Sequence, residues 1–105
     1  MAVVFVNTET VRPDRYDDYL DQIRQTKAVV ERCGGKSVRL LAALVAGEAT
    51  GSMAFIVEAD DFGAMGAVTD KIFSDPDGQA IMAAVNTSNY PGVGGQGSYW
   101  VDVPL

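Results

Sequence analysis

The chain has 105 residues and a net charge of −6, because fourteen acidic residues outnumber eight basic ones. A chain of this length predicts one domain, spanning residues 1–105. The negative charge disfavours nucleic acid as a partner, since phosphate backbones are negative too. No stretch resembles a signal peptide or has the roughly 20 apolar residues of a membrane helix, so we expect a cytoplasmic protein without membrane contact.

The sequence contains no histidine and one cysteine, Cys33. The absence of imidazole excludes a histidine base, a histidine metal ligand and a histidine axial ligand to haem. Any catalysis must therefore use other side chains, such as carboxylates or tyrosines. We expect neither a metal ion nor a cofactor.

The first half of the chain predicts a strand, a helix and a hairpin. Residues 2–11 begin with apolar or β-branched side chains on both faces, which indicates a strand covered on both sides. A helix is expected from Pro13 to about Cys33, where two glycines follow. Residues 36–46 and 52–59 are two apolar segments joined by a glycine-bounded turn, which favours a β-hairpin.

The second half predicts two helices and a last strand. Asp60-Asp61 caps a helix that ends near Ser74, and Asp75-Pro76 begins a shorter one. Residues 86–97 are expected to form a long loop, and residues 98–103 the final strand. The glycines at 92–97 match G-x-G-x-x-G, but they follow a helix and precede a strand, so they do not predict a dinucleotide site. The loop is either a flap that brings Tyr90 onto a ligand or a plain connection.

The order β-α-β-β-α-β is typical of an α+β, ferredoxin-like fold, with a four-stranded antiparallel sheet and helices on one face. The other face of such a sheet would expose more apolar surface than a monomer tolerates. We therefore expect a homodimer in which two sheets pack together as a dimeric α+β barrel.

The chain resembles the dimeric α+β barrel superfamily, in particular its NIPSNAP-like and antibiotic-biosynthesis-monooxygenase-like members. The element order carries the resemblance, together with the capped helix, the Asp-Pro break and the short helix between residues 59 and 85. The resemblance implies the fold and the homodimer more strongly than any chemistry, because one fold hosts many functions. Some members are cofactor-independent monooxygenases that act on polycyclic aromatic compounds.

Other members degrade haem with an asparagine on the first strand, a tryptophan and a histidine. Asn7 lies at a similar place, but the histidine is absent and Trp100 lies on the last strand. A haem-degrading activity would therefore lack its iron ligand.

Asn7 and Glu9 are the candidate catalytic residues, because they share one face of a central strand where polar groups need partners. If Arg39 lies nearby, Glu9 forms a structural ion pair. Otherwise Glu9 is a carboxylate able to act as a base. The ion pair is the more frequent arrangement in proteins.

Tyrosine and tryptophan combine an apolar ring with a polar atom and suit the rim of a pocket or a dimer interface. The candidate ligand-binding residues are Tyr19, Arg39, Tyr90, Tyr99 and Trp100. Two hypotheses follow. The first is a homodimeric barrel that binds a small apolar, aromatic or polyketide-like molecule, with oxygenation or isomerisation as the nearest activity. The alternative is a non-catalytic module for dimerisation or interaction.

Overall fold

The computed structural model describes all 105 residues apart from the side chain of Ala49. Its elements confirm the predicted order and the ferredoxin-like α+β fold. They are β1 (Val3–Val11), α1 (Tyr16–Arg32), β2 (Lys36–Ala42), a short 3₁₀ turn η1 (Gly47–Ala49), β3 (Met53–Ala59), α2 (Phe62–Ser74), α3 (Pro76–Val85) and β4 (Gly92–Val101).

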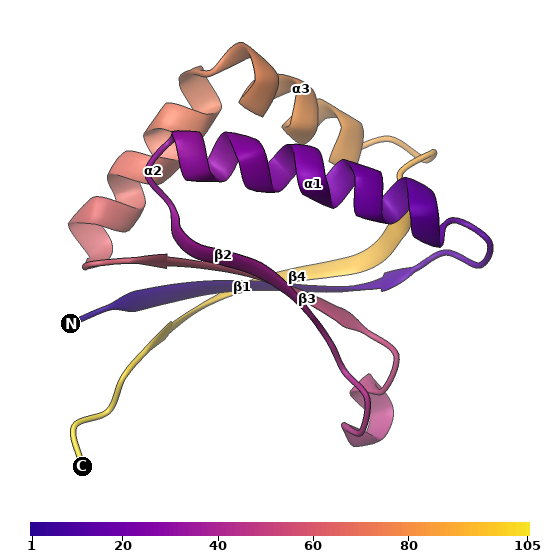
Figure 1. Ribbon diagram of the computed structural model, residues 1–105, viewed down its shortest axis with the longest axis horizontal. Helices are drawn as coiled ribbons and strands as arrows, with labels where there is room; N and C mark the ends of the chain where they lie inside the picture. The colour runs from indigo at the N-terminus through magenta and orange to yellow at the C-terminus, as the bar shows by residue number, and fades with distance from the viewer.

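The four strands form one antiparallel sheet in the order β2-β3-β1-β4, so β1 and β3 are the central strands. The helices all lie on one side of the sheet, and the other side is bare in this single chain (Figure 1). Alternate residues of each strand therefore face either the helices or the open side. We call these the helix side and the outer face of the sheet.

The core lies between the sheet and the helices. Phe55 and Val57 of β3 pack there in one cluster with Tyr19 and Ile23 of α1. Val3 at the start of β1 packs in another cluster with Ala59 of β3 and Met65 of α2. Burial of these side chains explains why the apolar sides of α1 and α2 face the sheet.

The helix ends follow the predicted capping chemistry with one exception. The Asp61 carboxylate accepts a hydrogen bond from the Ala64 N–H at 2.7 Å, and Asp75 accepts one from Asp77 at 2.8 Å. However, α1 begins at Tyr16 and not near Pro13. Asp14 has a φ of 62°, in the left-handed region, which a right-handed helix cannot contain.

The predicted loop over residues 86–97 was wrong in its second half, because β4 already begins at Gly92. Val11 pairs with Gly92 and Thr10 with Val93, whereas Thr8 pairs with Gln96. Gly94 and Gly95 therefore lie opposite Glu9 alone, which is a β-bulge, and Gly94 has the positive φ of 70° that such a bulge requires. The glycine-rich segment is thus a bulged strand and neither a flap nor a plain connection.

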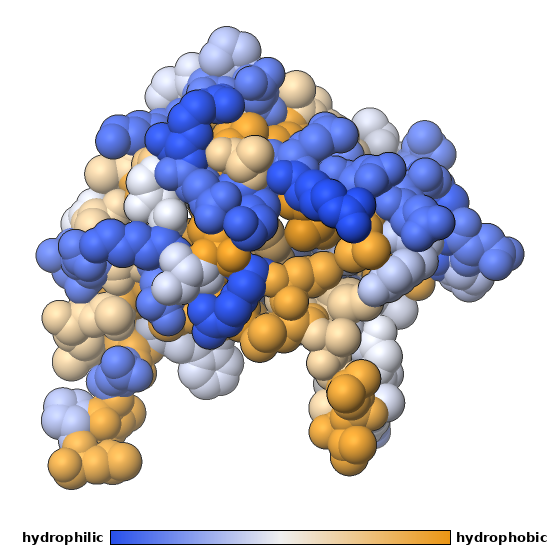
Figure 2. All heavy atoms as spheres, in the orientation of Figure 1, coloured by the Kyte–Doolittle hydropathy of each residue, from blue (hydrophilic) through white to orange (hydrophobic). Residues whose placement is uncertain are grey.

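The centre of the outer face is apolar, and polar side chains such as Arg39 and Glu58 lie around it. Val6 lies between Ile56 and Ser98, and Val4 lies beside Trp100, whose side chain is 62 % exposed. Two segments project beyond this face, the β2–β3 hairpin and the C-terminal tail (Figure 1), and both end in apolar atoms (Figure 2). Their exposed apolar residues are Leu44, Val45, Val103 and Leu105.

No helix in the described structure is both long enough and apolar enough to cross a membrane.

Candidate functional site

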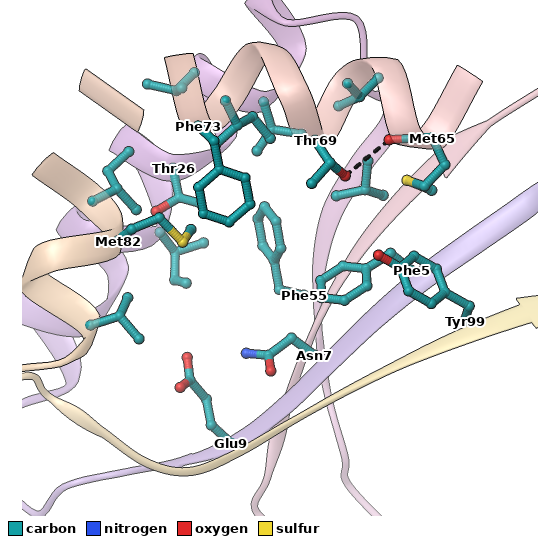
Figure 3. A pocket seen from close by; sticks show the side chains of 18 of the residues that line it. Phe5, Asn7, Glu9, Thr26, Phe55, Met65, Thr69, Phe73, Met82 and Tyr99 are labelled. Carbon is teal, nitrogen blue, oxygen red and sulfur yellow. Dashed lines mark hydrogen bonds between the residues drawn. The ribbon is translucent and has the colours of Figure 1, made fainter. Parts of the chain in front are cut away.

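A cavity of about 380 Å³ lies between the helix side of the sheet and the three helices. Its walls are mostly apolar, and Phe5, Phe55, Phe73 and Tyr99 supply aromatic rings to them (Figure 3). Asn7 and Glu9 of β1 provide polar groups on its sheet side. Their places follow from the strand period of two, which puts Phe5, Asn7 and Glu9 on the same face.

Glu9 is a buried carboxylate, only 5 % exposed. Its Oε1 accepts a hydrogen bond of 2.8 Å from the Tyr90 hydroxyl, which lies just before β4. Within the part of the chain that the structure describes, no lysine or arginine forms an ion pair with it. The carboxylate is therefore held by a neutral donor and has no compensating cation.

Two tyrosines lie close to this carboxylate. Burial and the neighbouring Glu9 raise the pKa of both Tyr19 and Tyr90, so that both phenols stay protonated at neutral pH. Tyr19 is completely buried, and its hydroxyl has no hydrogen-bond partner among the described residues. The polar end of the cavity therefore combines one carboxylate with two neutral phenols.

The Asn7 amide points into the cavity on the same side as the Glu9 carboxylate (Figure 3). It makes no hydrogen bond to the described residues, unlike Thr69 in the helical wall of the cavity, whose hydroxyl donates to the Met65 carbonyl at 2.9 Å. An amide offers both a donor and an acceptor. Asn7 is therefore free to bind a polar atom of a ligand.

Tyr99 of β4 lies at the exposed edge of the cavity between two phenylalanines. Its ring centroid is 5.4 Å from that of Phe5 and 6.2 Å from that of Phe62 at the start of α2. Such tilted and edge-on pairs are favourable arrangements of aromatic rings. Phe73 and Val85, both exposed, add apolar surface where α2 and α3 border the cavity.

The glycines of β4 make room for the polar end. A Cβ atom on Gly92 would lie 2.8 Å from Glu9 Oε2 and 2.8 Å from Tyr90 Cε2, which is too close. A Cβ on Gly95 would lie 3.7 Å from both Glu9 Oε2 and Asn7 Oδ1, an ordinary contact. Only glycine at position 92 therefore allows the Glu9–Tyr90 hydrogen bond in its present geometry.

The structure brings together four of the seven residues singled out from the sequence. Asn7, Glu9, Tyr90 and Tyr99 line the cavity. Tyr19 lies behind Glu9 in the core and does not line it.

The other two, Arg39 and Trp100, lie on the outer face. Arg39 pairs with Ile56, and its guanidinium donates to the Ser37 carbonyl at 3.1 Å. The ion pair considered for Glu9 and Arg39 therefore does not form, because the sheet separates them.

Sequence reasoning missed the helical part of the wall, which includes Thr26, Val68, Thr69, Ile72, Ile81, Met82 and Val85. The apolar ones have the spacing of ordinary core positions, and this periodicity carries no sign that space remains between them. Among the described residues there is also no group of three or more histidine, cysteine or acidic side chains placed to hold a metal ion.

No protein-family model matches the sequence, and no curated protein is similar enough to count as a relative. Solved structures do match. A NIPSNAP family protein from Agrobacterium tumefaciens aligns with a TM-score of 0.76 at 11 % identity, over 97 % of this chain and 86 % of the other. A NIPSNAP-like domain protein from Burkholderia xenovorans gives 0.73 at 11 % identity, over 97 % and 85 %.

SnoaB, a cofactor-independent oxygenase from Streptomyces nogalater, aligns with a TM-score of 0.71 at 17 % identity, over 99 % of this chain and 95 % of the other. These likenesses confirm the resemblance to NIPSNAP-like and monooxygenase-like proteins at the level of the fold. At such identities the fold is what the proteins share, and each function belongs to the protein for which it is described.

Proposed function

We propose that this protein binds a small apolar molecule of aromatic or polyketide-like character in the cavity between sheet and helices. The observation that carries the proposal is an apolar space of about 380 Å³ with an unpartnered amide and a buried carboxylate on one side. Ligand pockets typically combine apolar walls with a few convergent polar groups. A domain that served only as a packing module would fill this volume with side chains.

In this proposal the protein is a homodimer, and its two chains pack together through the outer faces of their sheets. The half-buried Val4 and Val6 and the exposed Trp100 form an apolar surface there, with a shallow depression beside Trp100. Exposed apolar patches of this kind mark interaction sites. A second copy would cover both this surface and the projecting Leu44 and Val45, and the buried free thiol of Cys33 suits a cytoplasmic setting.

Turnover is the second candidate function, and the buried Glu9 beside Asn7 favours it. Glu9 would take a proton from the ligand, and the Asn7 amide would donate to the oxygen that gains negative charge. Return of the proton to another carbon completes an isomerisation, and reaction of the carbanion with O₂ leads to oxygenation without a cofactor. The description of SnoaB as a cofactor-independent oxygenase supports the second route. The alternative to both is a non-catalytic dimerisation or interaction module.

Fluorescence titration with N-phenylnaphthylamine, a neutral apolar dye, tests the binding proposal. The dye should bind one site per chain and gain fluorescence there. Thr69→Trp places an indole in the cavity wall and should weaken binding by about tenfold or more. Ala67→Trp, an exposed position on the same helix, is the matched control and should bind like the unchanged protein. Absence of saturable binding, or equal binding by the two variants, would refute the proposal.

A further inference from the structure

We infer that the ligand carries an organic cation, a primary or secondary ammonium group on an aromatic body, and that Glu9 is its counter-ion. This inference rests on the proposed binding function and specifies the charge of the ligand. It begins from Glu9, the one charged side chain among the described residues that line the cavity. A buried charge is normally paired, because removing it from water without a partner is strongly unfavourable.

The protein itself leaves the charge of Glu9 uncompensated. Tyr90 donates a neutral hydrogen bond to it. Arg12, the first cation after β1, binds elsewhere, since its Nε donates to the Tyr90 main-chain carbonyl at 2.8 Å. A neutral ligand would satisfy the remaining lone pairs of Glu9 but leave its charge unbalanced. A cationic ligand would satisfy these lone pairs and also balance the charge.

The surroundings of Glu9 select an organic cation over a metal ion. One carboxylate and one amide are too few oxygen ligands for calcium or magnesium, and the rest of the wall is apolar. An ammonium group needs two or three acceptors, and the Glu9 carboxylate and the Asn7 amide face the same space (Figure 3). The amide nitrogen lies on the Glu9 side, so Asn7 presents its oxygen to the ammonium group after the amide turns about its last side-chain bond. The rings of Phe5, Phe55 and Tyr99 suit an aromatic body and are attractive to a cation.

The charge of the whole chain acts in the same direction. A net charge of −6 raises the local concentration of cations around the protein and lowers that of anions. No lysine or arginine lines the described cavity to receive a carboxylate or a phosphate. Anionic ligands are therefore disfavoured both at a distance and inside the cavity.

Three ligands that share a naphthylmethyl body and differ in the charge of their polar group test the inference by calorimetric titration at neutral pH. They are naphthylmethylamine, which is cationic, naphthylmethanol, which is neutral, and naphthylacetate, which is anionic. We expect the amine to bind at least about tenfold more tightly than the alcohol, and the carboxylate to bind more weakly still. Glu9→Gln, which keeps the shape and removes the charge, should make the affinities of amine and alcohol equal.

The matched control is Glu58→Gln, because Glu58 lies on the outer face of the same sheet opposite Val4. It should keep the full preference for the amine. Equal or tighter binding of the alcohol by the unchanged protein would overturn the inference, as would a preference that survives in Glu9→Gln. If the alcohol and N-phenylnaphthylamine bind but the amine is not preferred, the binding proposal holds and only the inference of a cationic ligand is wrong. If no probe binds, both proposals fail.

Discussion

Tyr90 and Glu9 are 81 positions apart in the chain, and a hydrogen bond of 2.8 Å joins the hydroxyl of one to the carboxylate of the other. This bond ties the segment between α3 and β4 to the central strand β1. It also fixes the direction of Glu9 at the polar end of the cavity. The stability of the fold and the geometry of the site are therefore linked through one side-chain pair.

Replacement of Tyr90 by phenylalanine should destabilise the protein by about 1–3 kcal/mol, because the buried Glu9 carboxylate loses its hydrogen-bond donor. Urea unfolding at neutral pH measures this change. Tyr16→Phe is the control, since Tyr16 is half exposed at the start of α1, and it should change stability by less than about 0.5 kcal/mol. Similar stabilities for the two variants would show that the Glu9–Tyr90 bond contributes nothing.

Stability should fall steeply above about pH 10, because the pKa values of Tyr19 and Tyr90 are raised in the folded protein. A raised pKa means that the unfolded chain releases these protons first. The stabilisation is therefore complete below the pKa of the unfolded chain and is lost as pH rises toward the folded values. Each tyrosine contributes a slope of up to about 1.4 kcal/mol per pH unit.

The urea midpoint, followed from about pH 9 to about pH 11, checks this dependence. Other groups titrate in the same range, so the comparison with Tyr90→Phe isolates the contribution of one phenol. The variant should lose stability less steeply with pH than the unchanged protein. Parallel slopes would mean that Tyr90 ionises equally easily in the folded and unfolded states.

Two glycines of β4 give a matched pair of substitutions. Gly92→Ala should destabilise the protein by about 1–3 kcal/mol, because its Cβ would lie 2.8 Å from both Glu9 Oε2 and Tyr90 Cε2. Gly95→Ala places a Cβ 3.7 Å from Glu9 Oε2 and should be nearly neutral. Thermal unfolding of both variants compares them directly. Equal losses would indicate a general effect of strand glycines and no specific one at the site.

Asn7→Ala should leave stability within about 0.5 kcal/mol, since the amide makes no hydrogen bond to the described residues. The same variant should weaken the binding of naphthylmethylamine by about three- to tenfold, the loss of one hydrogen bond. Calorimetric titration and urea unfolding of the same sample separate the two effects. A destabilised variant with unchanged binding would instead assign Asn7 a structural role.

The element order and the shared face of Asn7 and Glu9 were predictable from the sequence because both follow from local rules. The strand period of two alone puts these two side chains on one face, and aspartate caps mark where α2 and α3 begin. The fold follows from that order, since few arrangements connect such elements without crossing.

The remaining features depend on contacts between distant parts of the chain. The glycines at 92–97 look like a loop by composition, and only pairing with β1 turns them into a bulged strand opposite Glu9. Arg39 and Trp100 were assigned to the ligand by residue type, but the registers of β2 and β4 place them on the outer face. A register shift by one residue moves every side chain of a strand to the opposite face of the sheet. The sequence does not specify this register in a polar or glycine-rich edge strand.

Trp100→Asp should convert a dimer into a folded monomer. Trp100 is exposed in the single chain, so the substitution disturbs little within one subunit. In the proposed dimer the new carboxylate would be buried against the apolar outer face of the second copy, at a cost of several kcal/mol. Native mass spectrometry at micromolar concentration should find twice the chain mass of 11.1 kDa for the unchanged protein and the single mass for the variant.

Tyr16→Asp is the matched control for the dimer, because it introduces the same charge at an exposed aromatic position on α1, away from the outer face. It should remain dimeric, and an acidic residue near the start of a helix is favourable in itself. Circular dichroism confirms that all three proteins are folded. An unchanged protein that is monomeric and stable at about 100 μM would show that the outer face tolerates water. The apolar character of Val4, Val6 and Trp100 would then need another partner to explain it.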